Sequence, residues 1–252
     1  MKRLALILLA VLALAAAKPA AAQGAPDLAK VLALVDSRST FPNVDFSAIV
    51  QIKTDDPEKG RSEDKIAFFR RDAKDAFLML TLEPSSKKGQ GTLLVEDNLW
   101  FYDPTSRKFT HTSLKDNYGD SAAKNSDFRS SSKAEDYEVV SYVEASIGKY
   151  ECWVVDLRAK RDDVTYPFIK LWVSRGDYLQ LKAEEYSLTK RLLRTSLFPS
   201  YAKIGDKYVA TRSIFQDGLV AGKRTEIVMT DISVKPLSDE MFTKSYLEKV
   251  GR

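Results

Sequence analysis

Apolar and polar residues alternate along most of the chain, with the period of two that is typical of β-strands. Phe46, Ala48, Val50 and Ile52 share one face of such a run, and most of the residues between them are polar. Similar runs cover residues 65–71, 75–83, 91–96, 99–103, 107–112, 137–144, 150–159, 169–174, 178–187, 192–198, 201–205, 208–217 and 223–233. The pattern predicts a mainly β protein.

The residues between these runs are typical of tight turns, as at Asp97-Asn98 and Gly205-Asp206. Such short connections favour antiparallel neighbours, since parallel strands need long crossovers. A sheet of more than about ten strands rarely stays open and flat, so we expect this one to curl or close. Helical spacing is confined to two segments, residues 26–35 and residues 240–250.

The segment Leu114–Ala134, called the flap below, interrupts the β pattern. It reads LKDNYGDSAAKNSDFRSSSKA and consists mostly of polar and small residues. A structureless loop of this length is uncommon inside a compact domain unless it is functional. We interpret it as short helices in a mobile cover, and the alternative is a disordered insertion.

Three strand-like runs are apolar on both faces: residues 76–82, 99–102 and 152–155. The second face needs a cover, because large bare apolar patches are rare on soluble monomers. It could fill a barrel, form the seam between two sheets, line a cavity for an apolar ligand or bind a partner.

The first 22 residues are typical of a secretory signal peptide, with Lys2 and Arg3 before an apolar run and small residues at 20–22. The run 4–17 is short for a membrane anchor. We therefore expect one mature domain, residues 23–252, in the periplasm. Removal of the leader lowers the formal charge from +4 to +1, which argues against a nucleic-acid partner.

An exported carrier of lipid needs an apolar shell, since each exposed CH₂ of an acyl chain costs about 0.8 kcal/mol in water. A sixteen-carbon chain therefore costs on the order of 12 kcal/mol. This favours the cavity among the four interpretations of the doubly apolar strands. The shell must also release its cargo, which suits a polar, mobile flap.

Catalytic and metal-binding patterns are missing from the sequence. His111 is the only histidine and Cys152 the only cysteine, which excludes an internal disulfide and leaves no transition-metal motif. There is no G-x-S-x-G elbow and no P-loop. We therefore expect no catalytic residues, no metal and no cofactor, and we do not expect an enzyme.

Several motifs resemble a known family in their order along the chain. "LWFYDP" at 99–104 is followed by "KFTHTSLKDNYG", "IKLWVSRGDYLQLKAEEYS", "YAKIGDKYVATRSIFQD" and "TEIVMTDISVKPLSDEMFT". This series resembles the LolA-type periplasmic lipoprotein carriers, and more closely the outer-membrane lipoprotein-sorting proteins. The resemblance implies a half-open, incomplete antiparallel β-barrel with a few lid or plug helices around an apolar cavity.

The resemblance also implies a function and partners. The cargo would be an acylated lipoprotein or a lipid, received from an inner-membrane release complex and passed to an outer-membrane acceptor. In the carriers an arginine at the end of an early strand holds the lid closed through lid backbone. Here Arg71 takes that position, with Arg70 as the other candidate. The chain departs from the carriers in length and in lacking the proline after this arginine.

We expect a monomer whose cavity is lined from the aromatic and apolar strands. The residues expected to face the cavity are Phe69, Leu80, Leu94, Trp100, Tyr102 and Trp172. A register error of one residue would turn each of them outward. The alternative function is a periplasmic sensor of lipoproteins in envelope-stress signalling, although the tail beyond Lys235 is short for the second domain of such a regulator.

Overall fold

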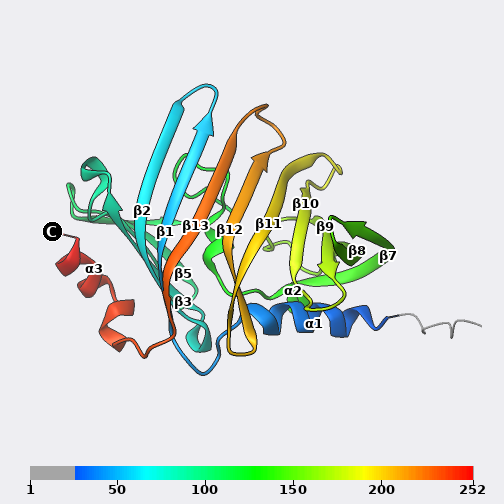
Figure 1. Cartoon of the computed structure of the whole chain (residues 1–252). Helices are drawn as coiled ribbons and strands as arrows, with labels where there is room; N and C mark the ends of the chain where they lie inside the picture. The colour runs from blue at the N-terminus through cyan, green and yellow to red at the C-terminus, as the bar shows by residue number, and fades with distance from the viewer. Residues whose placement is uncertain (1–25, 252) are drawn as a thin grey trace, which may run out of the picture.

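One antiparallel sheet organises the chain in the computed structural model, which describes residues 26–251 (Figure 1). Its thirteen strands run in the order β6-β5-β4-β3-β2-β1-β13-β12-β11-β10-β9-β8-β7. The strands are β1 (Phe46–Asp56), β2 (Gly60–Arg71), β3 (Ala76–Glu83), β4 (Gly91–Val95), β5 (Asn98–Asp103), β6 (Lys108–Thr112), β7 (Tyr137–Ile147), β8 (Tyr150–Ala159), β9 (Phe168–Ser174), β10 (Gln180–Tyr186), β11 (Leu192–Ile204), β12 (Lys207–Asp217) and β13 (Arg224–Ser233). The expected signal peptide, residues 1–22, lies outside the described residues.

The sheet does not close, because β6 and β7 form its two edges and are not paired with each other. This confirms the predicted mainly β, half-open architecture. The segments predicted as separate strands at 192–198 and 201–205 form one strand, β11. Its pairing with β12 shifts register between Leu197 and Tyr201, which interrupts the alternation there.

The inner face of the sheet carries the larger part of the core. On β1 to β5 it presents alternate residues such as Val50, Phe68, Phe77, Leu94 and Leu99, all of them buried. A second cluster continues along the inner face of β8 to β10. The apolar alternation of the sequence thus produces one continuous buried surface that must be covered from the same side.

Helix α1 (Leu28–Ser39) covers one end of this inner face, beside the short helix α2 (Lys133–Asp136), as Figure 1 shows. Asp27 caps α1 by accepting a hydrogen bond from the Lys30 amide at 3.1 Å. The predicted stripe of Leu28, Val31, Leu32 and Val35 is buried against β8 to β10. In residues 26–251, none of the helices has the length and apolar character that crossing a bilayer would require.

The flap covers the middle of the inner face and contains the 3₁₀ helix η3 (Asn125–Phe128). Ala122, Ala123 and Phe128 are buried against the inner cluster of β1 to β5. The flap amide of Ala122 donates to the Thr225 hydroxyl on β13 at 2.8 Å. The flap is therefore a packed cover with a short helical turn, which confirms the predicted helical cover and not the alternative of a disordered insertion; its predicted mobility stays a prediction.

The outer face of β3 to β5 has a separate cover at the C-terminal end of the described chain. Residues 234–243, called the connecting segment below, include η4 (Asp239–Phe242) and lead to helix α3 (Lys244–Val250). Leu247 of α3 is fully buried with Leu78, Leu93 and Tyr102. A Cβ on Gly91 would lie 2.4 Å from a Leu247 methyl, so this glycine permits the close approach of α3.

Candidate functional site

A cavity of about 850 Å³ lies between the inner face of the sheet and the flap. Its size is in the range of pockets that enclose a small organic ligand. Strands β1, β2 and β9 to β13, helix α1 and the flap all contribute to its wall. The apolar side chains of the wall include Val35, Phe46, Phe68, Leu99, Phe128, Ile169, Phe198, Val209, Phe215, Ile227 and Met229.

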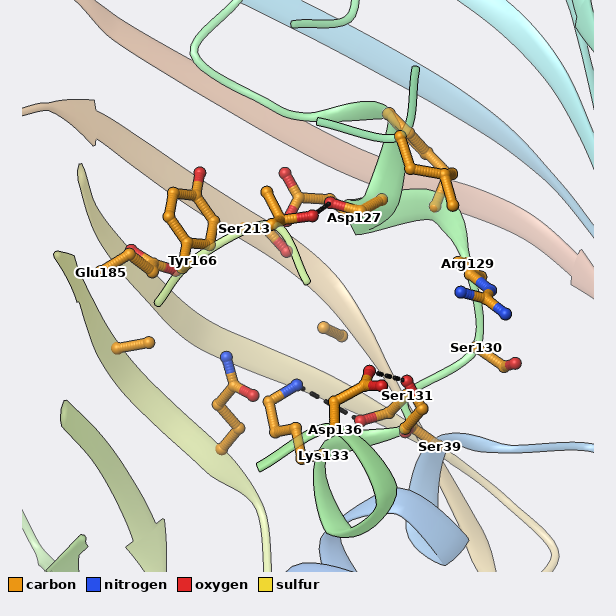
Figure 2. Close-up of a pocket in the computed structure, with 18 of the residues that line it drawn as sticks. Ser39, Asp127, Arg129, Ser130, Ser131, Lys133, Asp136, Tyr166, Glu185 and Ser213 are labelled. Carbon is orange, nitrogen blue, oxygen red and sulfur yellow. Dashed lines mark hydrogen bonds between the residues drawn. The ribbon is translucent and has the colours of Figure 1, made fainter. Parts of the chain in front are cut away.

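The polar side chains of the cavity form two groups (Figure 2). Asp127, Tyr166, Glu185 and Ser213 lie together on one side, where the flap meets β10 to β12. The second group lies where the flap runs into α2 beside α1. Its labelled members in Figure 2 are Ser39, Arg129, Ser130, Ser131, Lys133 and Asp136.

Arg194 of β11 organises the first group. Its Nη1 and Nη2 donate to the two carboxylate oxygens of Asp127 at 2.6 and 2.9 Å, so the pair is bidentate. Nη2 also donates to Glu185 Oε1 at 3.1 Å, and Ser196 Oγ donates to the same oxygen at 2.8 Å. Because Asp127 belongs to the flap, this ion pair ties the flap to the sheet.

Burial controls the electrostatics of this group. Desolvation raises the pKa of Glu185, and Arg194 and Ser196 counteract the shift only in part. Desolvation also lowers the pKa of Arg194, but Asp127 and Glu185 outweigh it and raise that pKa well above its ordinary value. Arg194 is therefore a permanent cation inside the cavity wall.

The second polar group joins the flap to α1. Asp36 of α1 accepts hydrogen bonds from the amides of Lys133 and Ala134 at 3.0 and 2.7 Å, which caps α2. The hydroxyl of Ser131 also donates to Asp36. Helix α1, α2 and the end of the flap are thus connected into one lid.

Arg70 and Arg71, the two lid-locking candidates, contact different covers. Arg70 lines the cavity, and its Nη2 donates to the backbone carbonyl of Ser39 at the end of α1, at 3.0 Å. Arg71 is bidentate with Asp45 at 2.7 and 2.9 Å and donates to the carbonyl of Leu237 at 2.7 Å. Arg70 therefore contacts the lid over the cavity, and Arg71 contacts the connecting segment that leads to α3.

The six residues expected to face the cavity lie elsewhere. Leu94 is on the inner face, but it packs in the core and is not part of the cavity wall. Four others lie on the outer face beside α3: Phe69, Leu80, Trp100 and Tyr102. Trp172 lies between two inner-face residues of β9 and therefore points outward. Alternation of side chains explains this difference, since the doubly apolar strands β3 and β5 use their second face to pack against α3, whereas Trp172 packs with Cys152 of β8.

The sequence alone did not identify the Arg194, Asp127 and Glu185 group. Asp127 is far from the other two residues in the sequence, and Glu185 follows Glu184 in a run that resembles a solvated strand edge. A usable signal exists in β10, where Ala183 and Glu185 share a face with apolar neighbours on β9. A carboxylate on a buried face indicates a buried cationic partner.

Neither metal binding nor histidine chemistry is indicated at this site. Within residues 26–251 no three His, Cys, Asp or Glu side chains are grouped as metal ligands would be. His111 lines the edge of the cavity with its ring 5.3 Å from the Trp100 ring. Cys152 is buried, and burial raises the pKa of its thiol. The arrangement is suited to holding an amphiphilic molecule by contact and hydrogen bonding.

Solved structures of the same fold come from several bacteria. A LolA superfamily protein from Nitrosomonas europaea is 27% identical, with a TM-score of 0.74 over 86% of this chain and 97% of its own. A protein from Vibrio parahaemolyticus, named for an outer membrane lipoprotein-sorting domain, has a TM-score of 0.77 at 19% identity, covering 87% and 97% of the two chains. A DUF1329 family protein from Desulfovibrio piger has a TM-score of 0.78 at 19% identity with the same coverage.

Sequence comparison adds a family match. No curated protein matches the chain. A family model described as "Uncharacterized protein" matches residues 73–249, which extend from the end of β2 to α3 and include the flap and the Arg194 group. The chain therefore belongs to the family of this model, and its fold is that of the LolA superfamily and the outer-membrane lipoprotein-sorting proteins.

Proposed function

We propose that this protein is a periplasmic carrier that encloses the acyl chain of a lipid or lipoprotein between its sheet and its flap. The observation that carries the proposal is the cavity of about 850 Å³ beneath the flap, with aromatic and aliphatic side chains along β1, β2, β12 and β13. Enclosure of a chain there would offset about 0.8 kcal/mol for each CH₂ removed from water.

The covers of the cavity support loading and release. The lid is held by hydrogen bonds and ion pairs at Asp36, Arg70 and Asp127, which exchange with water more readily than a packed apolar core does. Its partners would be those of the carriers that it resembles: a release complex in the inner membrane and an acceptor at the outer membrane. No catalytic step is needed for this function.

The proposal is tested by purifying the protein from the periplasm of an expressing bacterium and identifying co-purified molecules by mass spectrometry after solvent extraction. We expect acyl-chain lipids near one per protein, and uptake of a fluorescent fatty acid after they are stripped. Met229→Glu, on the cavity wall, should reduce this uptake at least tenfold, whereas Met241→Glu, in η4 of the connecting segment, should not. Absence of both co-purified lipid and uptake would refute the carrier function.

A further inference from the structure

Arg194 is a cation placed in the wall of a largely apolar cavity, with an exposed fraction of only 4%. Its guanidinium carbon lies 5.0 Å from the ring centre of Tyr166 and 4.5 Å from that of Phe215. Phe215 belongs to the apolar cluster of β1 to β5, and Tyr166 to the cluster under α1. The charge is therefore fixed where the two apolar surfaces meet, next to the space that an acyl chain would occupy.

The partners of Arg194 differ in how they are attached. Glu185 lies on β10 and is held by a hydrogen bond from Ser196 of β11, so it remains beside the arginine when the flap moves. The flap contributes the Ala122 carbonyl, which accepts from Nη1 at 3.3 Å, and Asp127. Asp127 lies in η3 of the flap, and its two oxygens occupy the terminal nitrogens of the guanidinium. Movement of the flap would remove Asp127 and leave a preorganised, two-pronged donor on the sheet.

The hydrogen bonding of Arg194 and Glu185 is also incomplete when the flap covers them. Nε of Arg194 and Oε2 of Glu185 are buried and have no hydrogen-bond partner among residues 26–251. Buried polar groups usually find a partner, so these two atoms are unusual in a folded core. They belong to side chains that line the cavity, which fits a site shaped for more than the contact with Asp127.

We propose that Arg194 is the headgroup site of an acidic amphiphile, and that the carboxylate of Asp127 occupies this site until a ligand replaces it. The inference rests on the proposed function and names its ligand class: one acyl chain with a terminal carboxylate or phosphate. A guanidinium fork matches the paired oxygens of either group.

The exchange preserves the local charge balance. A carboxylate head takes the place of the Asp127 carboxylate, and Arg194 keeps the same number of charge-assisted hydrogen bonds. A neutral head, such as a primary alcohol, gains no bond to Arg194 while Asp127 stays in place. If it displaces Asp127, it leaves a buried arginine without its second anion, which is costly. The site therefore selects acidic over neutral amphiphiles, and displacement of Asp127 couples ligand binding to a local rearrangement of η3 in the flap.

The test compares palmitate with hexadecanol, which has the same chain length and an uncharged head, by equilibrium dialysis against the stripped protein at neutral pH. We expect palmitate to bind about tenfold or more tightly than hexadecanol. Asp127→Asn removes the internal competitor and should raise the affinity for palmitate several-fold more than that for hexadecanol. Hexadecyl phosphate binding more tightly than palmitate would support the same site and assign it to a phosphate head.

Removal of the arginine needs a paired substitution, because Arg194→Gln alone leaves Glu185 buried without its partner. The double variant Arg194→Gln/Glu185→Gln should lose the preference for palmitate over hexadecanol, which is read from the ratio of the two affinities in the same variant. Equal affinities for the two ligands in the natural protein, or an equal gain for both in Asp127→Asn, would overturn the proposal and reduce Arg194 to a latch. Failure of both ligands to bind would instead refute the carrier function itself.

Discussion

The sheet has two covers that are attached in different ways. Helix α3 lies on the outer face of β3 to β5 and buries Leu247 in a packed cluster with Leu78, Leu93 and Tyr102. The flap lies on the inner face over a cavity of about 850 Å³ and is tied down by the ion pair of Asp127 with Arg194. One cover completes a core, and the other encloses space.

This difference in attachment indicates which of the two covers can open. Apolar burial is lost all at once when α3 leaves, because every methyl group under it becomes exposed to water. The flap also buries Ala122, Ala123 and Phe128, but Phe128 lines the cavity, where an acyl chain would take the place of the lost apolar contacts. The ionic and hydrogen-bonded contacts of the flap have alternatives in water or in a ligand, so their exchange costs less. We therefore assign a structural role to α3 and a gating role to the flap.

The largest expected effect comes from breaking the structural cover. Leu247→Ala removes a fully buried side chain, and we expect it to lower the free energy of unfolding by about 2–5 kcal/mol. Denaturant titration followed by circular dichroism measures this loss. Leu188→Ala is the matched control, since Leu188 is 78% exposed and should change stability by less than about 0.5 kcal/mol.

Palmitate binding by the Leu247→Ala variant, measured under conditions in which the variant is folded, tests whether α3 affects the cavity. We expect its dissociation constant to stay within about twofold of that of the natural protein, because α3 does not reach the cavity wall. A large loss of affinity in this variant would mean that the two covers are coupled through the sheet.

A smaller effect is expected from the neighbouring arginines, each of which bonds one cover. Arg70→Met removes the bond to the Ser39 carbonyl together with the ion pair to Asp72. Arg71→Met removes the bond to the Leu237 carbonyl together with the ion pair to Asp45. Each should cost about 1.5–3 kcal/mol, the range for hydrogen bonds to charged groups. Amide hydrogen exchange should accelerate at α1 and the flap in Arg70→Met, but at the connecting segment and α3 in Arg71→Met.

Ligand release distinguishes these two variants further. Only Arg70→Met should speed the dissociation of a bound fatty acid, since only Arg70 contacts the lid over the cavity. If Arg71→Met released the ligand as quickly, the lid-locking role would belong to the position that the family resemblance first indicated.

The smallest expected effect is a difference in pH dependence between the two covers. The bond from Arg71 lowers the pKa of Asp45. The stability that this ion pair gives to the connecting segment is therefore lost as the pH falls below the ordinary pKa of 3.8. Burial raises the pKa of Glu185. The stability that its protonated carboxyl group contributes is therefore full below pH 4.5 and is lost as the pH rises through the raised pKa. Glu185 faces Arg194 and Ser196, with Asp127 beyond the arginine.

The free energy of unfolding, measured as a function of pH, tests both predicted directions of change. Above pH 4.5, Glu185→Gln should flatten the decline in stability that burial of the carboxylate causes, and Asp45→Asn should not. Below pH 4, Asp45→Asn should remove part of the acid sensitivity. An unchanged slope in both variants would contradict the assignment of these two groups.

The sequence predicted the sheet better than the site. Period-two alternation and short turns identified the strands, because both signals are local. The inner or outer direction of a strand depends on what covers it, so Trp100 and Tyr102 were expected in the cavity and lie beside α3 instead. The Arg194 group unites residues from η3, β10 and β11, and no local pattern encodes such a meeting.

The most direct test of the account uses two methionine methyl groups as reporters, one in the cavity wall on β13 and one in the connecting segment. Met229 lines the cavity, whereas Met241 lies in η4 of the connecting segment. With ¹³C-methyl methionine and bound palmitate, nuclear Overhauser effects should join the acyl chain to the Met229 methyl and not to the Met241 methyl. Contacts to Met241 alone, with palmitate bound, would show that the hydrocarbon lies outside the cavity and would contradict the account.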